Sequence, residues 1–309
     1  MQSLFGYIGY VFGYILWFFY ELVKNYGVAI ILFTIVLKII MFPFSVKQQK
    51  SMAKNSIIAA KRNEITKRYE NDKNKLNEEL AKLYEKEGIS PFGGCFTMFV
   101  PLLLALGVYW AVIMPLTNTV HISPEHISGG LSTLQAVPGV GNIFSDSRYG
   151  EIMLVKYFSD FKEYLTMFTP AELANLEFFS KGFKFLGLDL LGTPSLSSFS
   201  SMLWIIPVLC FFSSVLTQVI TQKISGNNAM QAQQGCMKVM IYGFPLITAY
   251  FAYNVPAAVG FYWIISTLIQ FLQTLVLNHF YSAGSMIAKE EAARVTLREL
   301  EEKNVGMIG

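Results

Sequence analysis

Charged residues are scarce in this sequence, and they are missing altogether from three long segments. Only 15% of the 309 residues are Asp, Glu, Lys or Arg, whereas an ordinary soluble domain has about 25%. The segments without any of the four types are 88–124, 190–222 and 239–288. With a mean hydropathy of +0.43, these runs exclude a soluble globular protein and indicate several membrane-spanning helices.

Cysteine and histidine are also few, which excludes two more classes of protein. Three cysteines give no even-numbered disulfide framework, so a disulfide-stapled secreted fold is excluded. Three histidines, His121, His126 and His279, are too scattered to form a metal cluster. The motifs H-E-x-x-H, G-x-x-x-x-G-K-[ST] and G-x-S-x-G are absent from the chain. The sequence therefore predicts a protein that is not an enzyme and needs no cofactor or metal.

Hydrophobic runs and turn residues predict an all-α polytopic membrane protein with five spans. The N-terminal segment could lie on the membrane or cross it; its glycines and aromatic residues favour an interfacial position. Gly, Pro and Ser residues predict turns over 123–145. The expected order is an interfacial helix over 1–24, a span over 25–46, a charged helical hairpin over 47–90, a span over 91–114, a long loop over 115–198, a span over 199–221, a short loop over 222–236, two spans over 237–253 and 256–277, and a tail over 278–309.

The distribution of Lys and Arg predicts the orientation of these spans. If the hairpin is cytoplasmic, 17 basic residues lie inside and 6 lie outside, as the positive-inside rule requires. The N-terminus is then outside, the loop 115–198 is extracellular, and the tail is cytoplasmic. The expected location is a plasma membrane that the chain crosses several times.

Lys38 is a charged residue inside the first expected span. A lysine at the centre of a membrane helix costs roughly 2.5–3.5 kcal/mol on insertion scales, so its presence needs a reason. One interpretation is snorkelling to the cytoplasmic surface, and the other is a hydrated pocket inside the helix bundle. Polar residues on several spans, among them Thr34, Ser214 and Gln218, favour the pocket. The expected spans contain no Asp or Glu, which a proton-coupled transporter usually needs.

Four segments resemble the YidC/Oxa-type membrane protein insertases, and they occur in the family's order. They are N-Y-G-V-A-I-I-L-F-T-I-V-L-K-I-I-M-F-P-F-S-V-K-Q-Q-K-S-M at 25–52, P-F-G-G-C at 91–95, F-L-G-L-D-L at 185–190 and V-P-A-A-V-G-F-Y-W-I-I-S-T-L-I-Q at 255–270. The resemblance implies a five-helix core with a cytoplasmic helical hairpin and an external amphipathic helix. It also implies a groove that is open to the cytoplasm and to lipid and closed on the outside.

The resemblance also implies where substrates make contact. Lys38 stands where the family usually has arginine, which keeps the charge but loses the bidentate geometry of a guanidinium group. The residues expected to line the groove or contact substrate are Lys38, Gln218, Tyr262, Trp263, Thr34 and Ser214.

The function that the resemblance implies is insertion and folding of nascent membrane proteins. The implied partners are nascent membrane proteins, the ribosome, the Sec translocon and membrane lipids, without recognition of nucleic acid sequence. The alternative is a small-solute transporter or channel, which normally has repeated halves; the chain shows no internal repeat. A purely structural membrane protein would explain the hairpin but not Lys38.

Overall fold

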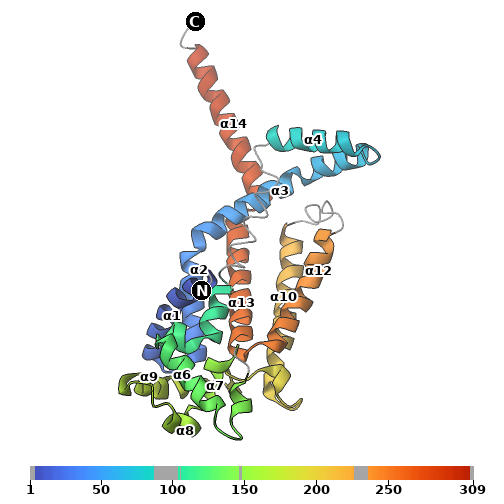
Figure 1. Cartoon of the computed structure of the whole chain (residues 1–309). Coiled ribbons are helices and arrows are strands. Elements are labelled where there is room, and N and C mark those ends of the chain that lie inside the picture. The colour runs from blue at the N-terminus through green and yellow to red at the C-terminus, as the bar shows by residue number, and fades with distance from the viewer. Residues whose placement is uncertain (1–3, 87–103, 105, 146–147, 226–235, 307–309) are drawn as a thin grey trace. The chain divides into compact units, whose positions relative to one another are not determined.

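The computed structural model describes residues 4–86, 104, 106–145, 148–225 and 236–306, and nearly all of its regular structure is helical (Figure 1). The chain divides into two compact units. The first comprises Met1–Ile39, Phe99–Val215 and Tyr242–Leu268, and the second comprises Ile40–Met98, Leu216–Ile241 and Ile269–Gly309. Residues 91–103 of the second expected span and most of the expected loop 222–236 lie outside the described residues.

The first unit contains two long N-terminal helices, a set of short helices and a small β-hairpin. Residues 106–113 are also helical. In the hairpin, β1 (Lys184–Phe185) pairs antiparallel with β2 (Leu188–Asp189). The helices are α1 Leu4–Val23, α2 Tyr26–Ile40, the π-helix η1 Leu116–Val120, α6 Pro124–Gln135, η2 Gly141–Phe144, α7 Gly150–Lys156, α8 Phe158–Phe161, η3 Lys162–Tyr164, α9 Pro170–Ser180, η4 Pro194–Leu196 and η5 Met202–Trp204.

Three further helices overlap the ranges 199–221, 237–253 and 256–277, which were expected to be spans. They are α10 (Ile205–Ser225), α12 (Cys236–Asn254) and α13 (Ala257–Phe280), and each contributes residues to both units. Three described segments are long and apolar enough to cross a membrane: Gly6–Val23, Met202–Thr221 and Ala257–Leu297. A fourth is obtained when α2 and the start of α3 are taken together.

The first expected span is not one continuous helix. Its helix α2 ends at Ile40, and after Met41 a new helix, α3 (Phe42–Arg68), begins. Pro43 stands in the first turn of α3, where its missing N–H costs nothing; inside a continuous helix its ring would clash with the carbonyl of Ile39. Lys38 therefore lies in the last turn of α2 and not near the middle of a 20-residue helix.

The second unit contains the charged hairpin and the C-terminal helix. The arms of the hairpin are α3 and α4 (Lys73–Lys86), with Ile58 and Leu83 buried. The helix α14 (Ala283–Gly306) follows. Tyr281, just before α14, lies under the ammonium groups of Lys50 and Lys289, which are 4.8 and 5.7 Å from the ring centroid.

One region expected to form turns is helical instead. The prediction of turns over 123–145 is wrong for its first half, because α6 occupies Pro124–Gln135. The Ser123 side chain accepts a hydrogen bond from the Glu125 N–H, and Pro124 occupies the first turn. These residues are turn formers in general, but in this order they start a helix.

The helix α1 packs closely against the segment that follows the second expected span. A Cβ atom at Gly13 would lie only 1.7 Å from the Asn118 carbonyl oxygen, so the two backbones are in direct contact there. Further along, the Tyr20 hydroxyl donates hydrogen bonds to the Phe178 and Phe179 carbonyls. The opposite face of α1 exposes large apolar or aromatic side chains at helical spacing: Tyr7, Val11, Tyr14, Phe18 and Leu22.

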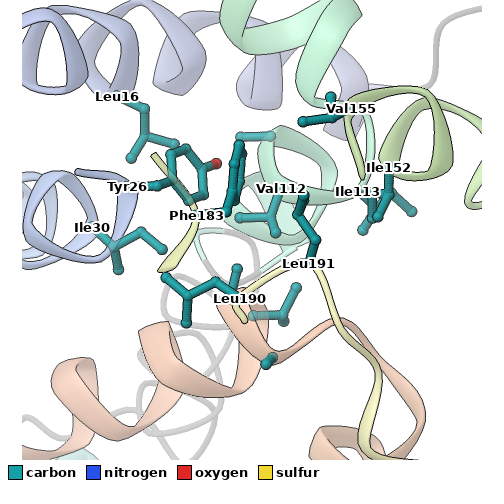
Figure 2. Packing of buried hydrophobic residues seen from close by; sticks show 14 of the residues in the cluster. Leu16, Tyr26, Ile30, Val112, Ile113, Ile152, Val155, Phe183, Leu190 and Leu191 are labelled. Carbon is teal, nitrogen blue, oxygen red and sulfur yellow. The ribbon is translucent and has the colours of Figure 1, made fainter. Parts of the chain in front are cut away.

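The core of the first unit joins segments that are far apart in the sequence. Figure 2 shows Leu16, Tyr26 and Ile30 from the N-terminal helices beside Phe183 and Leu190 from the hairpin region. The rings of Tyr26 and Phe183 are 4.5 Å apart. The segment around the β-hairpin is therefore part of the core and holds the start of α2 in place.

Candidate functional site

The residues that sequence reasoning assigned to a groove lie on α2, α10 and α13. On α2, Thr34 is fully buried, and its hydroxyl donates a 2.6 Å hydrogen bond to the Ile30 carbonyl. Lys38 is half-buried one turn later and therefore lies on the same side of the helix. Ile35 and Ile39 expose 40% and 66% of their surface on another side. The structure thus gives α2 one polar stripe and one apolar, exposed stripe.

Ser214 takes part in a polar contact between two helices. Its hydroxyl on α10 is 3.4 Å from the Thr248 hydroxyl on α12, and Thr248 also donates to the Pro245 carbonyl at 2.9 Å. Sequence reasoning did not select Thr248. The signal that could have found it is its spacing, since it follows by three residues a proline inside an apolar helix and can bond that proline's carbonyl.

The other three candidates differ in burial. Tyr262 on α13 is only 4% exposed and belongs to the core cluster of the first unit. Trp263 is half-buried, and its ring lies 6.4 Å from that of Phe251 on α12. Gln218 is half-buried on α10, one turn after Ser214, and falls in the second unit. Trp263 is thus better placed than Tyr262 to meet another molecule.

Residues 182–192 hold the first turns of two helices; sequence reasoning used only residues 185–190 of this segment, and only for the resemblance. The Tyr26 N–H at the start of α2 donates to the Gly182 carbonyl at 2.9 Å. At the start of α13, the Ala257 and Ala258 N–H groups donate to the Gly192 and Leu190 carbonyls at 2.8 and 3.0 Å. Backbone donors at helix N-termini have no partner within the helix, so this segment satisfies donors that would otherwise need water.

Side chains of the same segment fill the space between these helix ends. Phe185 lies against Gly27, where a Cβ atom would come within 2.4 Å of its ring. Its ring is also 5.1 Å from that of Phe261. Leu190 is fully buried. The N-terminal ends of α2 and α13 are therefore joined by apolar packing and by backbone hydrogen bonds.

A buried carboxylate, Glu151, binds the chain just after the second expected span. One oxygen, Oε2, accepts hydrogen bonds from the Leu116 and Thr117 N–H groups at 2.8 and 3.0 Å, and Oε1 accepts from the Thr117 hydroxyl at 2.6 Å. Burial raises the pKa of Glu151 to about 7, although these hydrogen bonds act in the opposite direction. Sequence reasoning did not single out Glu151.

The described part of the chain offers no metal centre. No three His, Cys, Asp or Glu side chains come together there in a way that could hold a metal ion. The chemistry that the described residues support is hydrogen bonding, charge attraction and apolar contact.

Comparison with known proteins gives the family of this chain. The model of a family described as "60Kd inner membrane protein" matches residues 18–284, which is most of the sequence. The chain belongs to the 60Kd inner membrane protein family. This family is the YidC/Oxa group, so the predicted resemblance is confirmed. The chain is therefore an all-α polytopic membrane protein of a bacterium, as family membership and the apolar helices together indicate.

Several members of the family are similar to parts of this chain. A protein named "Membrane protein insertase YidC" from Syntrophobacter fumaroxidans is 39% identical over 112 residues, which are 36% of this chain and 20% of that protein. Proteins of the same name are 44% identical over 92 residues in Caldanaerobacter subterraneus subsp. tengcongensis and 40% identical over 96 residues in Buchnera aphidicola subsp. Baizongia pistaciae. These matches cover 30% and 31% of this chain, and 45% and 18% of the two relatives. In all three cases the matched segment is less than half of the relative.

Proposed function

We propose that this protein is a membrane protein insertase that inserts nascent membrane proteins and helps them fold, without enzymatic chemistry or a cofactor. The observation that carries the proposal is the polar stripe of α2, where buried Thr34 and half-buried Lys38 lie within a helix whose other sides are apolar. Family membership and the names of the relatives support the same function.

In this proposal, a hydrated groove opens to the cytoplasm and to lipid. A polar or acidic segment of the substrate enters the groove and is attracted by Lys38, while the apolar part of the substrate contacts the lipid-exposed surface of the helices. Thr34, Ser214 and Gln218 supply hydrogen-bonding groups, and Trp263 supplies an aromatic contact. Passage through half of the bilayer in a polar groove lowers the desolvation cost that the substrate segment would otherwise meet in hydrocarbon.

The 182–192 segment supports a groove that is closed on the external side. Its carbonyls bind the first N–H groups of α2 and α13, and Phe185 and Leu190 fill the space beside them. A small-solute transporter or channel requires a polar path that continues to both sides of the membrane. Apolar packing at these helix ends speaks against such a path and favours the insertase.

The proposed topology has the N-terminus outside and the C-terminus in the cytoplasm of a bacterial cell, with α1 as an interfacial helix. The helical hairpin α3–α4 and the tail helix α14 are then cytoplasmic and available to the ribosome or the Sec translocon. The proposed partners are nascent membrane proteins, these two machines and membrane lipids. The segments placed inside hold 17 Lys and Arg residues and those placed outside hold 6, which supports this orientation.

The test is a charge series at Lys38, read out by complementation of an insertase-depleted bacterial strain and by insertion of defined substrates. Lys38→Arg keeps the charge and should remain active. Lys38→Met keeps the length without the charge and should insert substrates with acidic external segments several-fold more slowly. Lys38→Glu should be the least active with those substrates, because it repels them. Uncharged external segments should depend much less on the residue at this position.

The matched control is Lys162→Met on η3, which removes an exposed lysine far along the chain from α2 and should leave insertion of the same substrates unchanged. Membrane levels of every variant are compared by immunoblot, so that loss of protein is not mistaken for loss of activity. Full activity of both Lys38→Met and Lys38→Glu with acidic substrates would contradict the proposed groove charge.

A further inference from the structure

Three exposed apolar side chains of the first unit lie around the β-hairpin and just before α10. Leu186 in the hairpin turn is 78% exposed, Phe199 is 84% exposed and Met202 is 57% exposed. We refer to these three residues as the apolar rim. Exposure of this kind is costly in water, so something apolar is expected to cover the rim.

Leu186 is unusual in its backbone as well as in its exposure. Its φ is +48°, in the left-handed region that glycine and asparagine adopt readily and that a leucine rarely adopts. The next residue, Gly187, also has positive φ, at +82°. The turn therefore gives no backbone reason for leucine at 186, and the exposed side chain gives no core-packing reason. An outlier of this kind points to a function of the side chain itself.

Chain continuity places the rim beside the start of an apolar segment. Met202 is the first residue of the apolar segment Met202–Thr221. The exposed side of that segment begins at Met202 and continues through Ile205, Leu209 and Phe212, which are spaced by three or four residues and lie on one helical face. A Cβ atom at Gly187 would be 3.6 Å from the Met202 sulfur, so the hairpin turn sits beside the first residue of the span.

The surroundings of the rim suit the surface of a bilayer. Residues 190–222, which include Phe199 and Met202, carry no charged side chain. Beside Leu186, Lys184 is exposed and Asp189 is half-buried, and a lysine next to an apolar surface can extend its ammonium group to the lipid headgroups. The Trp204 ring lies 5.0 Å from that of Phe199 and 5.1 Å from that of Tyr253, near the end of α12. Tryptophan and tyrosine at the ends of spans are typical of the level of the lipid headgroups.

We propose that the apolar rim is a lipid anchor, in which Leu186, Phe199 and Met202 are immersed in the bilayer leaflet next to the start of α10. Lipid is the occupant because the rim continues the lipid-exposed side of the same helix. The anchor holds the 182–192 segment against the helix ends that it joins. Lipid contact at the rim does not depend on which substrates the protein handles. Only the assignment of the rim to the external leaflet rests on the proposed topology.

The first test measures the depth of residue 186 by electron paramagnetic resonance in phospholipid vesicles. A nitroxide label is attached at Leu186→Cys in a background where Cys95, Cys210 and Cys236 are replaced by alanine. A label in lipid is relaxed more strongly by oxygen than by a water-soluble nickel chelate. The control label at Glu163→Cys, on η3, should show the reverse order, since that side chain is exposed and far along the chain from any span.

The second test needs no change to the native cysteines. A photoreactive diazirine amino acid at position 186 of the otherwise native chain should form phospholipid adducts that mass spectrometry detects, and the same amino acid at 163 should form few. Stronger relaxation of the label at 186 by the nickel chelate, or protein adducts in place of lipid adducts, would overturn the proposal. The first result would mean that the turn is in water, and the second that a protein covers the rim.

Discussion

The buried carboxylate of Glu151 allows a quantitative prediction about pH and stability. The substitution Glu151→Gln keeps the shape of the side chain and its hydrogen bonds. The amide oxygen can accept from the Leu116 and Thr117 N–H groups, and the amide nitrogen can donate to the Thr117 hydroxyl, which now accepts. The substitution therefore removes the ionisable group with little other change, which isolates the effect of its charge.

The sign follows from the direction of the pKa shift. Burial raises the folded-state pKa of Glu151 from 4.5 to about 7, so between these values the folded protein binds more protons than the unfolded chain. The contribution of Glu151 to the free energy of unfolding is then fully present below pH 4.5, and it falls as the pH rises towards 7. Since one pKa unit corresponds to 1.36 kcal/mol, the native protein should lose about 2–3 kcal/mol between pH 5 and pH 8 from this group.

The assay compares thermal unfolding of the native protein and the Glu151→Gln variant in detergent at the two pH values. Relative to the native protein, the free energy of unfolding of the variant should rise by about 2–3 kcal/mol on going from pH 5 to pH 8. For the first unit this corresponds to roughly 5–10 °C in unfolding temperature. Other titrating groups are common to both proteins and cancel in the comparison. The same difference at both pH values would refute the reasoning.

The matched control is Glu151→Ala, which removes the acceptors as well as the charge. Two buried N–H groups and the Thr117 hydroxyl then lose their partner, and each buried unsatisfied group costs about 1–3 kcal/mol. This variant should be destabilised at both pH values. Unchanged stability of Glu151→Ala would mean that the contact with Leu116 and Thr117 contributes nothing.

Two further predictions concern packing and orientation. Gly13→Val should separate α1 from residues 116–120, because its Cβ would overlap the Asn118 carbonyl; trypsin should then cut the variant sooner than it cuts a Tyr7→Val control, whose side chain is exposed. Single cysteines at Asn74 and Ser145, both exposed positions, should differ towards an impermeant thiol reagent in intact cells: Ser145→Cys should react and Asn74→Cys should react only after lysis. Reaction at 74 in intact cells would reverse the proposed topology.

Long helices leave a strong signal in a sequence, because hydrophobic length and charge alone indicate them. The expected spans 237–253 and 256–277 correspond to α12 and α13 within a few residues at each end. The break in the first expected span was missed, although Pro43 was a signal for it. A proline near the end of an apolar run can end a helix or begin the next one, and hydropathy alone does not distinguish the two cases.

The candidate site was harder to predict because it depends on contacts between distant segments. Lys38 stands out in the sequence, since a charge in an apolar run is rare, whereas Thr248 becomes notable only when α12 is placed beside α10. The same holds for the 182–192 segment, whose partners lie more than 60 residues away on either side. The hydrogen bonds of this segment to Tyr26 and Ala257 use its backbone carbonyls. Every residue has a backbone carbonyl, so such bonds cannot be recognised from the sequence.

The two ends of α2 differ in what offsets the charges of the helix dipole. At the start of α2, a carbonyl of the 182–192 segment meets the N–H of Tyr26 and so offsets part of the positive end of the helix dipole. Lys38 lies in the last turn of the same helix, where the dipole favours a cation by about 0.3–1 kcal/mol. The roughly 2.5–3.5 kcal/mol that a lysine costs on insertion scales applies to the centre of a membrane helix, whereas Lys38 stands at a helix end. Helix electrostatics therefore offsets part of the cost of Lys38, and the break after Ile40 supplies the helix end at which it acts.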